Sequence, residues 1–204
     1  MLRFLGLLFG FYLFVGASVA KPLIVFVGDS LTDGYGLARP QAFPEKIRLL
    51  LEKNGYPTVK VINTGESGIT SARAPAQIRW ALQTKPDLLV LCLGANDGIR
   101  GISPQETKKN LTAALKLAQE AKVKLVLSGV KLPKNYGEKH RTEFENIFTA
   151  LGKTFPTFIF QPFLLEGVAG IPELNLSDGI HPNESGHDKI AQGLLPYIRK
   201  ALND

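Results

Sequence analysis

The stretch LIVFVGDSLTDG, residues 23–34, decides the fold of this chain. Its first five residues are apolar and mostly β-branched, a pattern typical of a buried strand in a parallel sheet. A polar run follows at once and contains Ser30. Since open α/β sheets hold their functional groups at the carboxyl ends of the strands, the stretch predicts that Ser30 lies at that edge of a sheet.

The rest of the chain alternates between short apolar segments and amphipathic helical patterns. This alternation predicts a parallel sheet that is covered by helices on both faces. Pro196 interrupts the last helical pattern, so a kink or a local break is predicted there. The predicted strands span residues 23–28, 59–63, 87–94, 124–129 and 157–160, and the predicted helices span residues 43–53, 71–83, 104–121, 138–155 and 184–202.

Residues 1–20 are typical of a secretory signal peptide. A positively charged start precedes the uncharged apolar residues 4–16, and Ser18 and Ala20 place small side chains where a signal peptidase recognises them. The apolar run is short for a membrane span, so we expect cleavage after it, with a retained N-terminal anchor as the alternative. We therefore expect an exported protein, periplasmic or secreted, in which residues 21–204 form a single domain.

The composition sets limits on possible partners. The chain has 24 Lys and Arg against 18 Asp and Glu, a formal net charge of +6. The basic residues are scattered without a block of five or six, which indicates an ordinary solvated surface and no nucleic-acid partner.

The one cysteine, Cys92, lies inside an apolar run and excludes an internal disulfide. The three histidines lack ligand spacing, so we expect no metal, and His140 and His187 fall in polar helical stretches that predict solvated side chains.

A carboxylate and an imidazole lie close together near the other end of the chain, in DGIHP, residues 178–182. One tight turn brings Asp178 and His181 together, and a hydroxyl, an imidazole and a carboxylate are the three parts of an activated serine nucleophile. We therefore predict Ser30 as the nucleophile, His181 as its base and Asp178 as the group that orients the base. The alternative is a helix start in which Asp178 is a cap and His181 only packs.

A serine nucleophile also needs donors for the oxyanion that it creates, and two loops after predicted strands offer them. Residues 63–68 contain glycines whose backbone N–H groups can approach a ligand closely. Residues 94–97 include Asn96, whose amide can donate, although such a segment can also be a plain turn. Asp29 and Asp97 flank these groups, and we interpret both as hydrogen-bonding braces for their loops.

Four short blocks of the chain resemble the motifs of the GDSL, or SGNH, hydrolase family: GDSL at 28–31, Gly68, GAND at 94–97 and DGIH at 178–181. The resemblance covers nearly the whole chain after residue 20. Residues 132–137 and 178–183 resemble in particular the exported bacterial arylesterases and multifunctional thioesterase/lysophospholipases of that family. Ala95 departs from the pattern, because many members carry a second glycine there, and its methyl group narrows the pocket or shifts the Asn96 loop.

This resemblance implies a flavodoxin-like, three-layer α/β/α sandwich with a five-stranded parallel sheet. It also implies an oxyanion hole formed by the backbone N–H groups of Ser30 and Gly68 and by the side chain of Asn96. Acylation of Ser30 would release an alcohol or a thiol, and water activated through His181 would then hydrolyse the acyl-enzyme. The implied substrates are aryl, acyl and lysophospholipid-type esters together with thioesters, and no cofactor is implied.

Two other functions stay open at this point. A carbohydrate O-deacetylase would use the same catalytic set, although the apolar segment 161–177 favours an apolar substrate. A flavodoxin-like binding module would instead cradle a phosphate on the first loop, where Asp29 and Asp33 disfavour an anion. Segment 161–177 itself is either a wall or lid beside the substrate or a loop packed onto the core. We expect a monomer that acts on a small ester or lysolipid and contacts membrane lipid transiently.

Overall fold

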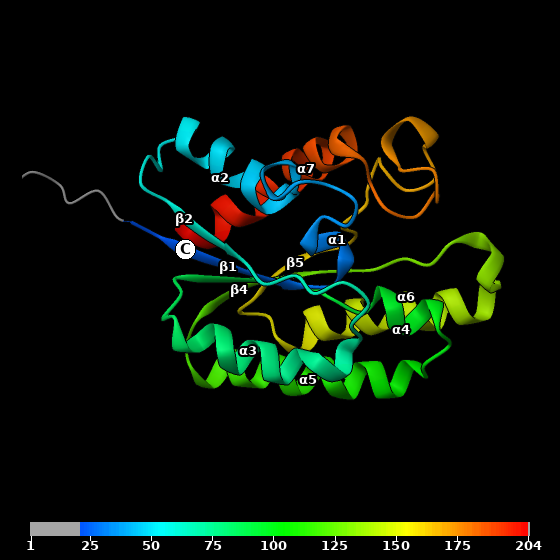
Figure 1. Ribbon diagram of the computed structural model, residues 1–204. Coiled ribbons are helices and arrows are strands. Elements are labelled where there is room, and N and C mark those ends of the chain that lie inside the picture. Colours follow the sequence, from blue (N-terminus) through cyan, green and yellow to red (C-terminus); the bar gives the residue numbers. More distant parts are fainter. Residues whose placement is uncertain (1–20, 204) are drawn as a thin grey trace, which may run out of the picture.

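Five parallel strands form the middle layer of the computed structural model, which describes residues 21–203 (Figure 1). The strand order is β2-β1-β3-β4-β5, which is that of flavodoxin-like folds. The expected signal peptide, residues 1–20, lies outside the described residues. The strands are β1 (Leu23–Gly28), β2 (Lys60–Asn63), β3 (Leu88–Cys92), β4 (Lys124–Ser128) and β5 (Ile159–Gln161).

The chain changes direction across the sheet between β1 and β3, which are hydrogen-bonded neighbours. Their register pairs Gly28 with Cys92, so both strands end at the same edge. In doubly wound sheets, the loops after two such strands diverge and leave a crevice for a ligand. The segments after β1 and β3, which contain Ser30 and Asn96, therefore start side by side.

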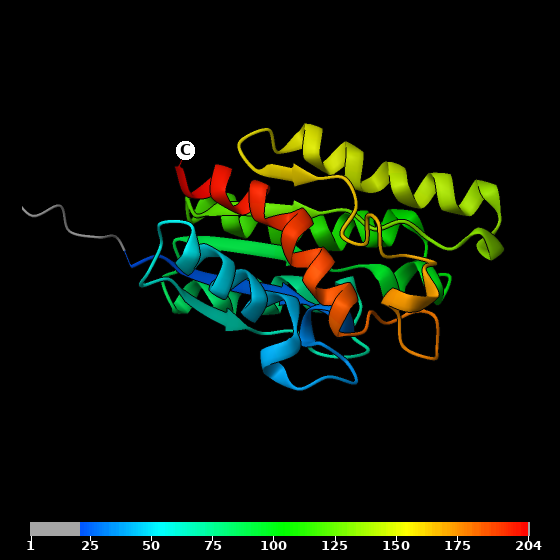
Figure 2. The same ribbon diagram turned by 90° about the horizontal axis from the view of Figure 1, so that it is seen from above.

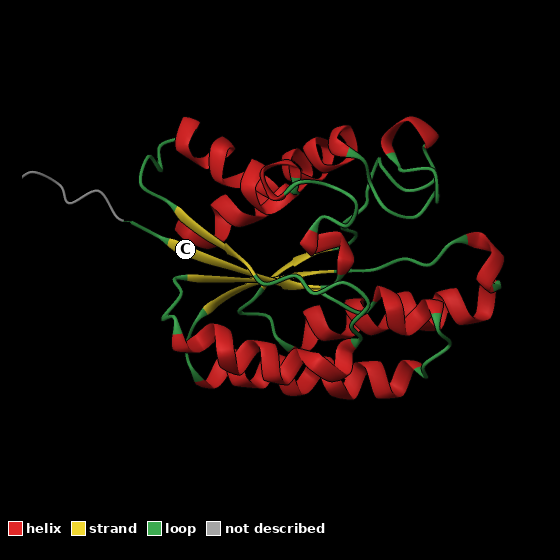
Figure 3. Cartoon of the chain, viewed as in Figure 1, coloured by secondary structure: helices red, strands yellow, loops and turns green. Residues whose placement is uncertain are grey.

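Helices cover both faces of the sheet, as the sequence predicted (Figure 3). α2 (Phe43–Lys53) and α7 (Glu184–Asn203) lie over one face, whereas α3 (Ala74–Gln83), α5 (Pro104–Glu120) and α6 (Glu138–Thr154) lie over the other (Figure 1). Within residues 21–203, none of the helices is sufficiently long and apolar to cross a bilayer. The shorter helices are α1 (Ser30–Asp33), α4 (Ala95–Ile99) and the 3₁₀ turns η1 (Arg39–Gln41), η2 (Ser71–Arg73), η3 (Lys134–Tyr136) and η4 (Pro172–Leu174).

The core has two halves because the sheet is buried on both faces. On β1, Val25 and Val27 pack among the side chains of α3, α5 and α6, whereas Ile24 and Phe26 pack beneath α2 and α7. All four side chains are fully buried. Figure 2 shows α2 and α7 side by side above the sheet. Successive side chains of a strand point to opposite faces, so a strand covered twice reads as one continuous apolar run.

Of the two outcomes predicted at Pro196, the local break is wrong, because α7 continues through that residue. A proline inside a helix removes one hydrogen bond to the carbonyl four residues earlier. That carbonyl belongs to Gln192, and both Gln192 and Pro196 are exposed, so water can take the place of the missing donor. Leu194 and Ile198 are fully buried and hold the two sides of the proline against the core.

Candidate active site

Ser30 is the first residue of α1, directly after the end of β1. Asp29 caps this short helix, since its Oδ1 accepts a 3.1 Å hydrogen bond from the N–H of Leu31. The turn is tight, because a Cβ atom on Gly28 would lie only 2.1 Å from Thr32 Oγ1. Ser30 is itself partly exposed, so its hydroxyl is accessible at the sheet edge.

The structure brings Ser30, His181 and Asp178 into one line of contacts. His181 Nε2 lies 3.0 Å from Ser30 Oγ, and His181 Nδ1 lies 2.7 Å from Asp178 Oδ2. The turn between the last two is held by Asp178 Oδ1, which accepts the N–H groups of Ile180 and His181 at 2.8 Å and 2.9 Å. These distances fit the tautomer in which Nδ1–H donates to Asp178 and Nε2 accepts from the serine hydroxyl.

The charge of Asp178 supports this tautomer. Partial burial raises the pKa of its carboxyl, but the N–H donors of His181 and Ile180 and the His181 imidazole outweigh it and lower the pKa to about 2. Asp178 is therefore an anion throughout the neutral range. An anion in this place would stabilise a protonated His181 imidazole.

Asn96 and Gly68, the other two candidate oxyanion donors, are linked through Ile69. Asn96 is in the first turn of α4, directly after β3, and its Nδ2 donates a 2.9 Å hydrogen bond to the carbonyl oxygen of Ile69. An amide carries two hydrogens, so the second remains available to a ligand. Gly68 is exposed and has a φ of 83°, a conformation that favours glycine. Because Ile69 follows it directly, the Asn96 bond holds both candidate donors in one place.

Asp97 is a brace, as the sequence predicted. It is fully buried and accepts three hydrogen bonds, from the N–H of Ser71 at 2.8 Å, from Ser71 Oγ and from Thr107 Oγ1 at 3.1 Å. Ser71 begins η2, which follows the loop after β2, while Thr107 belongs to α5. Asp97 thus ties the loop of Gly68 to the loop of Asn96.

Asp29 also braces its loop, through the hydrogen bond from Leu31, but its carboxylate is less well satisfied than that of Asp97. Its side chain is 1% exposed, and within the described part of the chain Oδ2 has no hydrogen-bond partner. Burial raises the pKa of this carboxyl to about 6, and the hydrogen bond from Leu31 only partly opposes the increase. The residue directly before Ser30 is therefore a carboxyl group whose ionisation costs free energy in the folded protein.

We expect Asp29→Asn to stabilise the protein at about pH 8 by up to about 3 kcal/mol, since an amide has no charge to bury. The folded pKa lies above the unfolded value of 3.8, so the stability that Asp29 contributes is complete below that pH and is lost as the pH rises to about 6. Urea unfolding should show the advantage of the variant growing over this interval and then levelling. Asp87→Asn, at an exposed aspartate that accepts from Leu23 N–H, is the matched control. If the gain in the free energy of unfolding of Asp29→Asn did not change with pH, the raised pKa of Asp29 would be contradicted.

Tyr35 is a neighbour of His181 that the sequence did not reveal. The two ring centroids lie 4.5 Å apart with the planes tilted by 36°, and Tyr35 is 51% exposed. Its N–H donates a 3.1 Å hydrogen bond to the carbonyl oxygen of Ser30. The feature of the sequence that could have pointed to Tyr35 is an aromatic residue between two glycines, Gly34 and Gly36. Both glycines have positive φ values, 85° and 79°, and turn the chain at this point.

The prediction of solvated side chains is wrong for His187, which is buried, whereas His140 is partly exposed. His187 is 1% exposed, and its Nδ1 accepts a 3.0 Å hydrogen bond from the N–H of Phe43. His140 is partly buried, and its Nε2 lies 3.1 Å from the carbonyl oxygen of Gly98. Cys92 is buried as expected, and burial raises the pKa of its thiol. The polar residues around these histidines could not show that each one has a hydrogen-bond partner on a different element, Phe43 on α2 for His187 and Gly98 on α4 for His140.

Segment 161–177 packs onto the core through its apolar residues. Leu164 and Val168 are buried among the side chains beneath α7, whereas Ile171 is 38% exposed. The packing interpretation therefore holds for Leu164 and Val168. A surface cavity of about 400 Å³ lies between this segment and α7. Ser30, His181 and Asp178, which together are called the Ser30 line below, do not line this cavity. Its lining residues are Gln161, Pro162, Phe163, Leu164, Glu166, Lys189, Gln192, Gly193 and Tyr197.

A serine, a histidine and an aspartate in line at the edge of a parallel sheet are typical of the class of α/β hydrolases that use an activated hydroxyl. A model of the GDSL-like Lipase/Acylhydrolase family matches residues 26–189. The chain belongs to this family and is an ester hydrolase of the GDSL type. The family resemblance of the sequence motifs is thereby confirmed, and the binding-module alternative is set aside.

Similar proteins agree in sequence and in fold. The chain is 33% identical over 203 residues to an arylesterase of Vibrio mimicus, covering 99% of this chain and 100% of the relative. It is 33% identical over 190 residues to thioesterase 1/protease 1/lysophospholipase L1 of Escherichia coli K12, covering 91% and 88%. The crystal structure of TesA matches with a TM-score of 0.84 and 32% identity, covering 88% of this chain and 99% of that one. The predicted flavodoxin-like sandwich is confirmed.

Proposed function

We propose that the chain is a serine esterase that cleaves carboxylic esters through an acyl-enzyme on Ser30, with His181 as the base and Asp178 as its orienter. One observation carries this proposal: an unbroken line of contacts runs from Asp178 Oδ2 through both His181 nitrogens to Ser30 Oγ, at 2.7 Å and 3.0 Å. Both distances lie within the range over which a side chain can transfer a proton.

In the first step, Ser30 Oγ forms a bond to the acyl carbon while His181 Nε2 takes the hydroxyl proton. The electron pair of the carbonyl moves to its oxygen, to which the N–H groups of Ser30 and Gly68 and the second amide hydrogen of Asn96 donate. The bond from the acyl carbon to the leaving oxygen or sulfur then breaks. The protonated His181 gives its proton to the departing alcohol or thiol.

In the second step, water attacks the acyl carbon of the Ser30 ester, and His181 takes a proton from that water. The same donors hold the second oxyanion, and the carboxylic acid leaves as Ser30 Oγ regains its proton from His181. Asp178 stabilises the imidazolium in both steps. All of these steps use groups of this chain, so the proposed reaction needs no metal or cofactor.

Two observations support an aryl, acyl or lysophospholipid-type ester as the substrate. Tyr35 and Ile180, each 51% exposed, place apolar surface directly beside His181. The relatives include an arylesterase and a thioesterase 1/protease 1/lysophospholipase L1. We therefore extend the proposal to a broad range of unbranched acyl chains and to thioesters.

We also propose the setting in which the enzyme works. Residues 21–204 would be a single monomeric domain, exported to the periplasm or beyond after removal of residues 1–20. Its partners would be small ester or lysolipid substrates, with transient contact with membrane lipid when a lysolipid is bound. The intact mass of the protein purified from the exported fraction tests the removal of residues 1–20, because cleavage there leaves a chain that begins with Lys21.

The test of the function is hydrolysis of p-nitrophenyl esters, from acetate to long acyl chains, by the full chain after expression and export. We expect turnover of aryl and acyl esters, and the chain-length profile should report the size of the acyl pocket. Activity confined to acetylated sugars would replace the proposal by the O-deacetylase. Absence of hydrolysis of every ester and thioester would contradict it.

Asn96→Ala should lower kcat roughly 10²- to 10³-fold, because one donor to the oxyanion is lost. KM should change much less, since the ground-state carbonyl carries little of the charge that the amide stabilises. Asn135→Ala, at an exposed asparagine of η3, is the matched control and should leave kcat unchanged. A kcat for Asn96→Ala within about threefold of the wild type would remove Asn96 from the oxyanion hole.

A further inference from the structure

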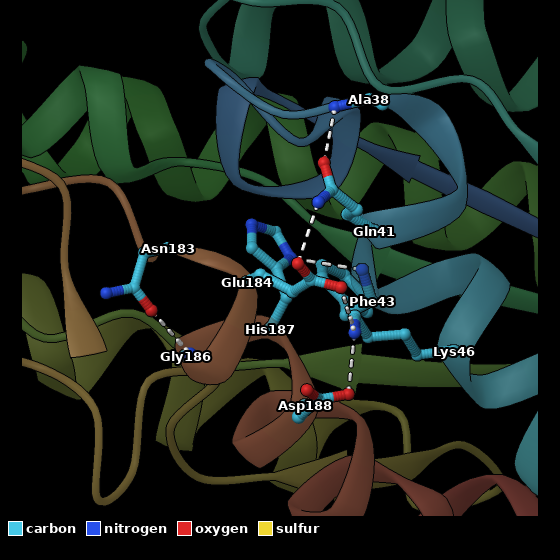
Figure 4. Close-up of polar contacts among 9 residues, drawn as sticks. All are labelled: Ala38, Gln41, Phe43, Lys46, Asn183, Glu184, Gly186, His187 and Asp188. Atoms are coloured by element: carbon cyan, nitrogen blue, oxygen red, sulfur yellow. Dashed lines mark hydrogen bonds and ion pairs between the residues drawn. The ribbon is translucent and has the colours of Figure 1, made fainter. Parts of the chain in front are cut away.

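His187 supplies the cap that α2 lacks at its first turn (Figure 4). The N-cap of α2 is Ala42, which has no side-chain acceptor, and the N–H of Phe43 donates instead to His187 Nδ1 over 3.0 Å. His187 is 1% exposed and Phe43 is fully buried, and their rings stack with centroids 5.9 Å apart. Since Nδ1 accepts, the imidazole is neutral and carries its hydrogen on Nε2.

The two partners of this hydrogen bond belong to the segments that carry the proposed base and nucleophile. His187 follows His181 by six residues, and Phe43 follows Ser30 by thirteen. The bond therefore joins two parts of the chain that are 144 residues apart in sequence, just as the contact of Ser30 with His181 joins two parts that are 151 residues apart.

Backbone hydrogen bonds tie His181 and Asn183, the residue before α7, to the same short segment, residues 174–176. The N–H of Leu176 donates to the carbonyl oxygen of His181 over 2.7 Å, and the N–H of Asn183 donates to that of Leu174 over 3.0 Å. Asn183 Oδ1 in turn accepts from the N–H of Gly186 over 3.1 Å, which caps the helix. A shift of the α7 N-terminus would therefore carry His181 with it.

A rim of polar contacts surrounds the buried bond (Figure 4). Lys46 Nζ lies 2.7 Å from Asp188 Oδ1 and 3.4 Å from Glu184 Oε1, and Gln41 Nε2 donates to Glu184 Oε2 over 2.7 Å. Both carboxylates are about half exposed, whereas the Lys46 side chain is 13% exposed. Because the carboxylate end of each ion pair is open to solvent, water and salt screen it, whereas the His187 bond is buried at both ends.

We propose that His187 is a positioning residue: as a neutral acceptor, it fixes the N-terminus of α7 on α2 and thereby holds His181 Nε2 within hydrogen-bonding distance of Ser30 Oγ. This inference rests on the proposed function for the roles of Ser30 and His181. A misplacement of about 1 Å between reacting groups can cost roughly 10²-fold in rate, even when it originates far from the reacting atoms.

The bond depends on the charge state of His187. Protonation would place an N–H opposite the Phe43 N–H and remove the acceptor. The charged or titratable groups around it are Lys46 on α2, Glu184 and Asp188 on α7, and His181. Burial first and Lys46 second lower the pKa of His187 from 6.5 to about 4, against the opposing effect of Asp188. The stability from the neutral ring is complete above 6.5 and is lost as the pH falls toward 4, so the bond persists at neutral pH.

Two variants separate positioning from packing. His187→Asn keeps an acceptor, because Oδ1 takes the place of Nδ1, whereas His187→Leu keeps an apolar side chain of similar size without one. For p-nitrophenyl butyrate at about pH 8, we expect kcat of His187→Leu to fall roughly 10- to 100-fold with KM within about twofold. The kcat of His187→Asn should stay within about threefold of the wild type, and Lys46→Gln, which removes only the ion pairs of Lys46 with Glu184 and Asp188, should do the same.

A folded His187→Leu protein with wild-type kcat, or a His187→Asn protein as slow as the leucine variant, would overturn the proposal. Amide hydrogen exchange of Phe43 tests it without any substrate. After correction for intrinsic rates, exchange in the wild type should accelerate at least about tenfold between about pH 6 and pH 3.5. Unchanged exchange would overturn the proposal even if the leucine variant does not fold, and a wild type that hydrolyses no ester would refute only the proposed function.

Discussion

Ser30→Ala is expected to lower kcat for ester hydrolysis roughly 10⁶-fold, to the level of the background reaction. Without Oγ, no acyl-enzyme can form, and the donors of Gly68 and Asn96 can only polarise a carbonyl. The hydroxyl is bonded to His181 at a partly exposed edge of the sheet and takes no part in the core. The melting temperature should therefore stay within about 2 °C of the wild type.

Steady-state kinetics with p-nitrophenyl butyrate, beside thermal unfolding, checks this expectation. Ser185→Ala, at an exposed serine in the first turn of α7, is the matched control and should keep the full rate. An organophosphate ester should label the wild type once, on the peptide that contains Ser30, and should not label the variant. Residual activity above about 1% of the wild type, or a label on another peptide, would identify a different nucleophile.

Asp178→Asn is expected to lower kcat by roughly 10⁴-fold although it changes the shape of the site very little. The amide oxygen can still accept the N–H groups of Ile180 and His181, so the turn should persist. The amide nitrogen then faces His181 Nδ1 and donates to it, which moves the ring hydrogen to Nε2. In that tautomer, Nε2 cannot accept the Ser30 proton.

The kinetics of Asp178→Asn should be measured together with the ¹⁵N shifts of the His181 ring, which report the tautomer directly. Asp87→Asn, at the opposite edge of the sheet before β3, should have wild-type kcat and the wild-type His181 spectrum. A loss below about tenfold would mean that Asp178 does not orient the base. A large loss with an unchanged tautomer would assign Asp178 a purely electrostatic role.

The strands and the residues of the Ser30 line could be predicted because their signals are local. An apolar run such as residues 23–27 is buried on both faces only in a sheet covered by helices, and the polar residues directly after it must then lie at the sheet edge. Asp178 and His181 are three residues apart, so one turn brings them together whatever the rest of the chain does. Asp97 could be interpreted as a brace, although its partners Ser71 and Thr107 could not be foreseen.

His187 shows where the local signal was misread. Ile190, Ala191 and Leu194 lie three, four and seven residues after it and are all buried, so His187 belongs to the same face of α7. A polar side chain on such a face requires a partner, and the partner here is the N–H of Phe43 on α2. The local break predicted at Pro196 is wrong for a related reason, because Gln192 and Pro196 are exposed on α7 and water can take the place of the missing donor.

The sequence by itself determined the order of the elements, the sheet edge that carries the site and the chemical groups gathered there. It could do so because strand and helix periodicities and short motifs are properties of single segments. Only the tertiary structure decided that His181 and Ser30, 151 residues apart, meet at 3.0 Å, that the Tyr35 ring lies against the imidazole at a tilt, and that His187 is buried as an acceptor. Those facts depend on how α2, α7 and the edge loops pack against one another, and no single segment encodes that packing.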